Sequence, residues 1–466
     1  MSRPKLFRDP VHGQIRYEKT GEADPFPGSK KGRGRTRAAV RERQVGWLIQ
    51  RLMDCPEFQR LRHCRQNGVT NLVFHGAEHS RFAHSMGAAF LAREMFERIE
   101  RNADRVESDA HFLATVAAAL LHDVGHGPFS HALEHILERC GVDFDHERMT
   151  ERFIEEDSSI HAVLSEVDPQ FPQEVANYVR KKRPVEHWRY RIVSSQLDAD
   201  RLDYLLRDAR SVGLDQHSFD LSRLLEFLEH LDGTRIAVDR RGLEAVESYL
   251  VMLDHMYRAV YFHHAVRAAS CLLESVFARA VALDRAGMAD PFGRNGPGAN
   301  PFVGLIGQGV GLDLSTYARL GEFHAWELIE RWQASTDTAL ADLSRRLMRR
   351  DLFKAIDVRD DDYKAMRQLD DRAKDLTRSS LGFVDDTTIE HYVVIDEPKR
   401  TSYKWYNWRE EDRVDESIWI VGLDKPQPIE SYKRSRIVQG LKETQYLPRL
   451  LVTAEVRDRL NSGAGI

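Results

Sequence analysis

The sequence has 466 residues, of which 42% are hydrophobic and 30% charged, an ordinary globular balance with enough length for two or three structural units. The formal net charge of −5 excludes a protein that is basic throughout and coats nucleic acid, while leaving a local basic patch open. The four cysteines form no C-x-x-C pair, and neither a signal peptide nor a run of about 18 apolar residues is present, so we expect a cytoplasmic protein without membrane contact.

The first distinctive segment covers residues 22–43, which begins with proline and glycine and then becomes strongly basic. Its cationic residues are Lys30, Lys31, Arg33, Arg35, Arg37, Arg41 and Arg43. This composition predicts an insertion that is either a solvated loop or a lid or anion-binding surface for nucleotide or nucleic acid.

Helical periodicity dominates the chain that follows. Apolar residues at i, i+3 and i+4 predict helices over Arg81–Glu100, Asp109–Asp123 and Asp198–Arg210. The second of these is apolar almost all round, as expected of a buried helix. The same pattern runs from Val246 to Leu283, which is long enough for two helices or one bent helix.

Strand signals are few. Arg235–Gly242 fits a hairpin arm, and His391–Pro398 and Ser417–Leu423 are short β-branched runs bounded by breakers. Residues 289–304 are rich in glycine and proline and predict a loop. The whole pattern predicts a mainly α fold, with a large helical region over 1–350 and a small α+β region over 351–466.

Titratable residues crowd together in LLHDVGHGPFSHALEH, residues 120–135, where the buried helix is expected to end. Neighbouring residues on a helix diverge by about 100°, so His122 and Asp123 can share one ion only at a helix end. His84 in SRFAHS and Asp200 in LDADRLDY would complete a set of two histidines and two aspartates. Taken singly, a histidine is more often a core residue and an aspartate more often a helix cap.

A ligand set of nitrogen and oxygen without thiolate suits one divalent ion of manganese, magnesium, iron or zinc. Four protein ligands of this type leave coordination positions open to water, which is typical of a catalytic rather than a structural site.

The motifs RFAHSMG, HDVGHGPFSHALEH and LDADRLDYLLRDA, in the order H…HD…D, resemble the HD-domain phosphohydrolase superfamily. DPVHGQI (Asp9–Ile15) and CPEFQRLRHCRQNG (Cys55–Gly68) resemble its deoxynucleoside triphosphate triphosphohydrolase branch, meaning bacterial dNTPases and the catalytic region of the SAM-and-HD-domain enzyme. The resemblance implies an HD-domain helical bundle that hydrolyses dNTPs to deoxynucleoside and inorganic triphosphate.

The resemblance also implies roles for residues around the metal. It implies phosphate-side roles for His126 and His146 and a catalytic pair of His131 and Glu134, whose i, i+3 spacing gives them a common helix face. The family usually has aspartate where this chain has Glu134. The implied substrate contacts are Gln66, Arg81, Arg201, Tyr204, Asp208 and Tyr261, although either tyrosine fits a core aromatic equally well and Arg201 fits a solvated helix charge.

One position departs from the family pattern. Eight residues before Tyr261, where the family often has an arginine facing the triphosphate, this chain has Leu253. Two alternatives therefore stay open: a hydrolase or phosphodiesterase acting on another nucleotide or on single-stranded nucleic acid, and a nucleotide-sensing or nucleic-acid-binding module without turnover.

The resemblance further implies an assembly. It places Asp54, Gln59 and Arg62 where an activating nucleotide can bind between subunits, and it implies a homo-oligomer such as a tetramer or hexamer. In such an assembly the 351–466 region would serve in oligomerisation or regulation, or its strands would simply complete the fold.

Overall fold

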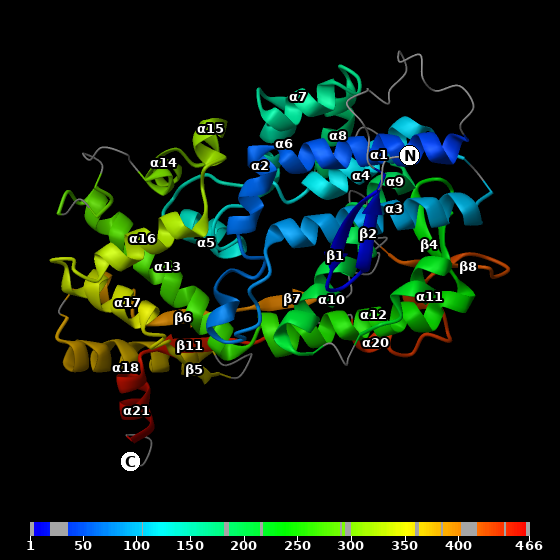
Figure 1. The fold of residues 1–466 in the computed structure, drawn as a ribbon. Helices are drawn as coiled ribbons and strands as arrows, with labels where there is room; N and C mark the ends of the chain where they lie inside the picture. Colours follow the sequence, from blue (N-terminus) through cyan, green and yellow to red (C-terminus); the bar gives the residue numbers. More distant parts are fainter. Residues whose placement is uncertain are drawn as a thin grey trace.

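The structure of the chain is a computed structural model that describes residues 4–18, 36–104, 106–180, 186–214, 218–288, 291–293, 300–358, 363–383, 385–401, 417–441 and 444–462. Residues 22–35 of the predicted basic insertion, and 289–290 and 294–299 of the predicted loop, lie outside the described residues. Helices account for most of the described chain and the strands are short, which confirms the predicted mainly α class (Figure 1).

Three helices form the centre of the fold. Helix α3 (Arg81–Asn102) packs against both α4 (Asp109–Leu121) and α10 (Ala199–Val212). Residues 112–121 of α4 are all buried, as its uniformly apolar sequence predicted. Ser80, Ser108 and Asp198 cap the three helices, each accepting a backbone N–H from the first turn. The three predicted helices are therefore confirmed to within a few residues.

The long periodic stretch from Val246 forms two helices rather than one. Helix α12 (Leu243–Met256) ends in a π-helical turn over Tyr257–Tyr261, and α13 (His264–Arg285) then sets off in a new direction (Figure 1). A π turn carries an extra residue within a helix and is often found at functional sites. This turn places Tyr257 and Tyr261 beside the pocket described below.

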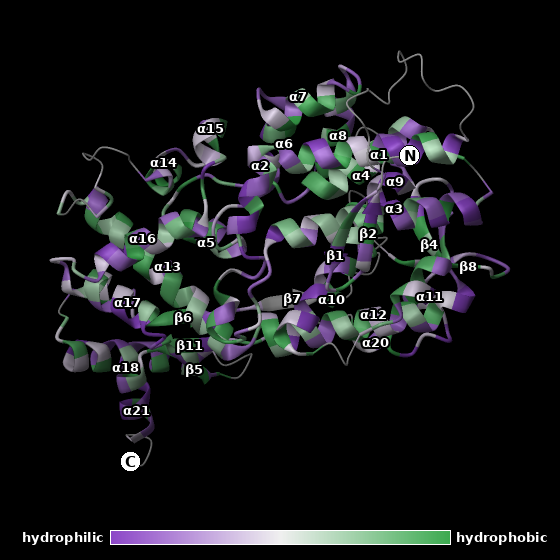
Figure 2. Cartoon of the chain, viewed as in Figure 1, coloured by the Kyte–Doolittle hydropathy of each residue, from purple (hydrophilic) through white to green (hydrophobic). Residues whose placement is uncertain are grey.

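The other helices complete the body of the fold. The chain before α12 adds α1 (Arg37–Asp54), α2 (Pro56–Gln59), α5 (His131–Arg139), α6 (His146–Glu155), α7 (Ser159–Ser165), α8 (Phe171–Val179), α9 (Trp188–Arg191) and α11 (Leu221–Glu226). The chain after α13 adds α14 (Pro301–Gln308), α15 (Leu314–Tyr317), α16 (Glu322–Trp332), α17 (Thr338–Met348), α18 (Tyr363–Leu381), α19 (Asp386–Ile389), α20 (Val438–Leu441) and α21 (Ala454–Ser462). Figure 2 shows α21 as largely hydrophilic where it projects from the body. Among the described residues, no helix combines the length and hydropathy needed to cross a membrane.

The end of the predicted basic insertion is helical. Residues 37–43 form the start of α1, so the loop does not extend to Arg43 as predicted. Arg41 makes ion pairs with Glu100 at 2.6 Å and with Asp109 at 2.9 Å, and it also stacks over the ring of Phe112. These pairs anchor α1 to the central helices, so this arginine is committed to the fold.

An N-terminal hairpin precedes the helices and was not predicted. Strands β1 (Lys5–Asp9) and β2 (Gly13–Tyr17) pair antiparallel, with Lys5 opposite Tyr17. Asp9 Oδ1 accepts the backbone N–H groups of Val11 and His12 at 2.8 and 2.9 Å, and Gly13 closes the turn at a φ of 72°.

The remaining strands form three small sheets. One sheet has the order β3 (Leu228–Leu231), β4 (Arg235–Asp239), β8 (Trp419–Val421), β9 (Gln427–Pro428), so Arg235–Gly242 does supply a hairpin arm. A second has the order β5 (Lys354–Asp357), β11 (Arg449–Val452), β6 (Val394–Asp396), and β7 (Lys399–Thr401) pairs with β10 (Thr444–Tyr446).

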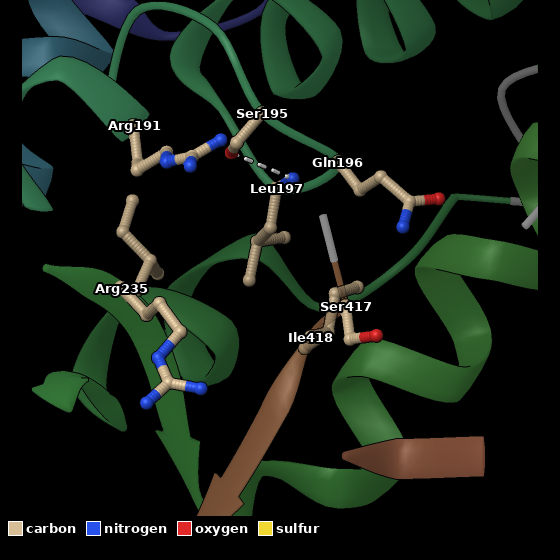
Figure 3. Close-up of a pocket in the computed structure, with 8 residues that line it drawn as sticks. Arg191, Ser195, Gln196, Leu197, Arg235, Ser417 and Ile418 are labelled. Carbon is tan, nitrogen blue, oxygen red and sulfur yellow. Dashed lines mark hydrogen bonds between the residues drawn. The ribbon is translucent and has the colours of Figure 1, made fainter. Parts of the chain in front are cut away.

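The C-terminal region contributes to two places. Its sheet around β11 encloses a small second core with α18 and α21. Its strand β8 runs parallel to β4 and so joins the sheet of the preceding region. Figure 3 shows this junction, where Ser417 and Ile418 lead into β8 opposite Arg235 and the 195–197 loop. The crevice between them contains none of the predicted site residues.

Candidate metal centre and substrate pocket

Four predicted metal ligands, distant in the chain, come together at one point. His84 lies on α3, His122 and Asp123 directly follow α4, and Asp200 lies in the first turn of α10. His84 Nε2 is 3.0 Å from Asp200 Oδ1 and 3.5 Å from Asp123 Oδ2, and His122 Nε2 is 3.3 Å from Asp123 Oδ1. The end of α4 therefore lets adjacent residues converge, as expected.

The hydrogen bonds of the two histidines show why this cluster suits a cation. His84 Nδ1 donates to Asp203 at 2.8 Å and His122 Nδ1 donates to the carbonyl of Ala119 at 2.8 Å. In the neutral rings, both Nε2 atoms then carry lone pairs, and these two atoms lie 3.3 Å apart. When both rings are neutral, as metal ligands must be, two lone pairs and two carboxylates converge at one point, so the residues present fit a divalent metal ion.

The charges of the cluster also indicate that it suits a cation. Burial alone would lower the pKa of His84, but hydrogen bonds to Asp200 and Asp203 outweigh it and raise that pKa to about 10. Burial raises the pKa of Asp123, but Arg81 and the histidines lower it overall to about 2. The site thus holds ionised carboxylates that attract positive charge, from protons or from a metal.

A second cluster faces the pocket beside the first. Glu134 on α5 lies 3.3 Å from His131 Nδ1 and also pairs with His146 Nδ1. The ring of His126 stacks on that of His146, with centroids 3.7 Å apart. Burial and the nearby Arg81 hold the pKa of His126 well below its usual value, so this ring is neutral. The structure therefore brings together the four residues that the resemblance assigned to catalysis.

Backbone strain is stored immediately before this cluster. Phe129 and Ser130 adopt φ values of 64° and 56°, which non-glycine residues rarely do. Ser130 Oγ accepts from Arg81 Nε at 2.7 Å and donates to the carbonyl of Arg65 at 2.7 Å. These hydrogen bonds hold the strained turn, which starts α5 at His131.

A pocket opens beside both clusters. Its walls include every predicted substrate contact: Gln66, Arg81, Arg201, Tyr204, Asp208 and Tyr261. The phenol of Tyr261 donates to Asp208 at 2.5 Å, and His79 pairs with the other oxygen of Asp208 at 2.7 Å. Tyr261 therefore lines the pocket and is hydrogen-bonded there, which goes beyond the role of a plain core aromatic.

Two polar groups in this pocket lack a partner within the described protein. Gln66 Oε1 and Asn67 Nδ2 are buried and make no hydrogen bond there. An unsatisfied buried polar group costs about 1–3 kcal/mol, so such groups mark places where a ligand completes the hydrogen bonding.

Leu253, at the position where the family often has an arginine, is buried with 1% of its surface exposed, so no cation stands at that position.

Sequence reasoning missed several residues of the site. Arg267 of α13 does line the pocket, held by Asp396 of β6 at 2.7 Å. His12 and Asp203 lie behind the metal centre. The spacing of Asp203 three residues after Asp200 was a signal for the last of these, since both lie on one helix face.

The three residues implied for an activating nucleotide lie at the end of α1, at the end of α2 and in the 3-10 turn over Arg60–His63 that follows it. Gln59 accepts from Arg62 Nε at 2.8 Å, and Arg62 lies over the ring of Phe82 at 3.6 Å. Asp54 is the last residue of α1. They form one surface edge, separate from the pocket lining.

Comparisons with known proteins agree with this geometry. The HD domain family matches residues 81–208 and the HD associated region matches residues 219–291. An uncharacterized protein of Bacillus subtilis, YwfO, is 33% identical over 417 residues, which cover 88% of this chain and 84% of that protein. The deoxynucleoside triphosphate triphosphohydrolase SAMHD1 of Gallus gallus is 30% identical over 310 residues, covering 59% of this chain and 45% of that enzyme.

A solved structure has the same fold. The crystal structure of a phosphohydrolase from Bacteroides thetaiotaomicron superposes with a TM-score of 0.74 at 23% identity, covering 97% of this chain and 100% of that one. With the Bacillus relative matched over most of its length and both HD regions recognised, the chain belongs to the HD-domain phosphohydrolase superfamily, as its motifs predicted.

Proposed function

We propose that this chain is a metal-dependent triphosphohydrolase that converts dNTPs to a deoxynucleoside and inorganic triphosphate. The observation that carries the proposal is the meeting of His84, His122, Asp123 and Asp200 beside a pocket lined by arginine and histidine. A bound divalent ion would supply Lewis-acid activation of the phosphate and of an attacking water. The ion would be manganese, magnesium, iron or zinc.

In this proposal, different residues along the pocket bind the phosphates and protonate the leaving group. Arg81 and Arg201 are fixed cations in the pocket wall that suit phosphate oxygens, and the neutral His126 can donate a hydrogen bond there. Hydrolysis breaks the bond between the α-phosphorus and the 5′-oxygen, with water adding to phosphorus. We assign to His131, held by Glu134, the proton delivered to that leaving oxygen.

The sugar would lie farther along the pocket. Asp208 and Tyr261 form a hydrogen-bonded acceptor and donor pair, and Gln66 Oε1 is a buried acceptor without a donor among the described residues. These groups suit a sugar hydroxyl, which can both donate and accept. The relation to SAMHD1, a deoxynucleoside triphosphate triphosphohydrolase by name, supports the same substrate class.

The test is identification of the products. Purified protein with Mn²⁺ or Mg²⁺ is incubated with each dNTP singly and in pairs, and the products are analysed by mass spectrometry. We expect deoxynucleoside and triphosphate from the wild type and none from His122→Ala. His135→Ala is the matched control, because its ring is 55% exposed and pairs only weakly, with Glu138 at 3.9 Å. Release of a nucleoside monophosphate would contradict the proposal.

A second candidate substrate is favoured by one observation. This chain has the buried Leu253 at the position from which the family often directs an arginine at the triphosphate tail, so that cation is missing there. Turnover of another nucleotide or of single-stranded nucleic acid, with all dNTPs inert, would support this alternative.

We also propose that the chain forms a homo-oligomer in which Asp54, Gln59 and Arg62 bind an activating nucleotide. The support is their common position at one surface edge and the resemblance that assigns them this role. Activation of one dNTP's turnover by another in the paired incubations, lost in Arg62→Ala, would be the expected result.

A further inference from the structure

A buried carboxylate, Asp203 of α10, lies directly behind the metal centre and takes no part in the functions described above. Asp203 Oδ2 accepts from Nδ1 of the metal ligand His84 at 2.8 Å, and Oδ1 accepts from Nε2 of His12 at 2.6 Å. The side chains of all three residues are 0–1% exposed. One carboxylate therefore joins a metal ligand to the turn of the N-terminal hairpin.

We propose that Asp203 and His12 are positioning residues, which hold the His84 ring in its metal-binding orientation and so tie the hairpin to the metal centre. The inference rests on the metal site of the proposed function. A hydrogen bond from the far nitrogen of a ligating histidine fixes both the tautomer and the orientation of the ring.

The carboxylate is itself held on every side. Arg207 Nε and Nη2 donate to the two oxygens of Asp203, each at 2.9 Å, and Arg207 Nη2 also reaches Asp9 at 2.9 Å. With two arginine donors and two histidine donors on its two oxygens, the carboxylate cannot rotate without losing a hydrogen bond. The position of the His84 ring is thus set by residues of α10 and of the hairpin.

Helix α3 leaves space for the Asp203 carboxylate because it has a glycine, Gly87, at the point of contact. A Cβ atom at Gly87 would lie 1.8 Å from Asp203 Oδ1 and 2.5 Å from Arg207 Nη2. Glycine inside a helix is less favourable than alanine, so its presence here needs a reason. The glycine one turn after His84 is therefore needed for the carboxylate to approach the helix.

We call the hydrogen-bonded series His84–Asp203–His12 the relay. Its hairpin end, His12, is equally constrained. Asp9 fixes the turn by accepting the backbone N–H of His12 at 2.9 Å, and the His12 ring packs against Phe90 with centroids 5.2 Å apart. Asp9 also bonds Arg207, so the turn contacts the relay at two points. Coupling between two sites is reciprocal, so metal binding must stabilise the hairpin as much as the hairpin favours metal binding.

The first test measures Mn²⁺ affinity of the metal-stripped protein by calorimetry, without substrate. Asp203→Asn leaves an amide N–H facing a donor, and we expect affinity to fall by about 10–100-fold. His12→Ala should weaken binding in the same direction, and His12→Gln, which keeps a donor, should recover part of the loss. Arg16→Ala is the matched control on the same hairpin, because its side chain is 63% exposed and its ion pair, among the described residues, is with Glu18.

The second test is hydrogen exchange of residues 5–17 with and without Mn²⁺. We expect the metal to slow exchange of the hairpin in the wild type and in Arg16→Ala, but not in Asp203→Asn. A merely structural role for the relay would not make hairpin exchange depend on metal. Two results would overturn this inference alone, provided that the wild type binds Mn²⁺ normally. One is a Mn²⁺ affinity of Asp203→Asn and His12→Ala within twofold of the wild-type value. The other is hairpin exchange in the wild type that does not change when Mn²⁺ is added. A wild type that binds no divalent metal removes the proposed function as well.

Discussion

Replacing Glu134 by glutamine tests how the second cluster works. The carboxylate of Glu134 accepts from His131 at 3.3 Å and pairs with His146, so one side chain holds two rings. A glutamine keeps the shape but offers one oxygen and one NH₂ group, so one ring loses its acceptor. Hydrogen bonds to charged groups contribute about 1.5–3 kcal/mol each. Loss of one, together with a misplaced proton donor, predicts a kcat lower by about 10²–10⁴-fold.

The assay is release of inorganic triphosphate at saturating substrate and Mn²⁺. Glu138→Gln is the matched control one turn farther along α5, because its side chain is 83% exposed and lies 3.9 Å from the ring of His135. Glu134→Asp, the residue usual in the family, should recover only part of the activity because its shorter arm cannot serve both rings at once. Wild-type kcat in Glu134→Gln would refute the assignment of His131 as the proton donor.

Glu134→Gln should also change how the free energy of unfolding depends on pH. Burial raises the pKa of Glu134, but hydrogen bonds from His131 and His146 outweigh it and hold that pKa well below its usual value. Because the folded-state pKa is depressed, its stabilisation is present above the unfolded value of about 4.3 and is lost as the pH falls through the folded value. Urea unfolding at pH 7 and pH 3 should show a larger acid-induced loss in the wild type than in Glu134→Gln. Equal losses would contradict the ionised pair.

Three further predictions follow from other parts of the structure. Tyr261→Phe removes the 2.5 Å hydrogen bond to Asp208, so KM for a dNTP should rise several-fold while the metal affinity stays unchanged; an unaltered KM would remove Tyr261 from the substrate site. Gly125→Ala would place a Cβ 2.1 Å from the carbonyl of His146, so thermal unfolding should show a loss of about 1–3 kcal/mol from overpacking. All four cysteines are buried, which raises their thiol pKa values, so a thiol reagent at pH 8 should label the native protein slowly and the unfolded protein at four sites.

The sequence by itself determined the helical class and the positions of the central helices. Apolar spacing located α3, α4 and α10 because their buried faces repeat with the helical period. It did not locate β1 and β2, since two five-residue strands are too short for periodicity to separate them from a loop. It also placed the late strands loosely, since β6 spans only Val394–Asp396 of the predicted run.

For the site, the sequence determined which residue types were available, and the tertiary structure decided which atoms meet. The order H…HD…D singled out His84, His122, Asp123 and Asp200, but only the packing of α3, α4 and α10 sets their nitrogen and oxygen atoms 3.0–3.5 Å apart. The spacing after Asp200 was a signal for Asp203, but its hydrogen bond to His12 was beyond sequence reasoning, because 191 residues separate the two partners. Local spacing determines helices through short-range sterics, whereas contacts between side chains that are distant in sequence form only when the tertiary structure forms.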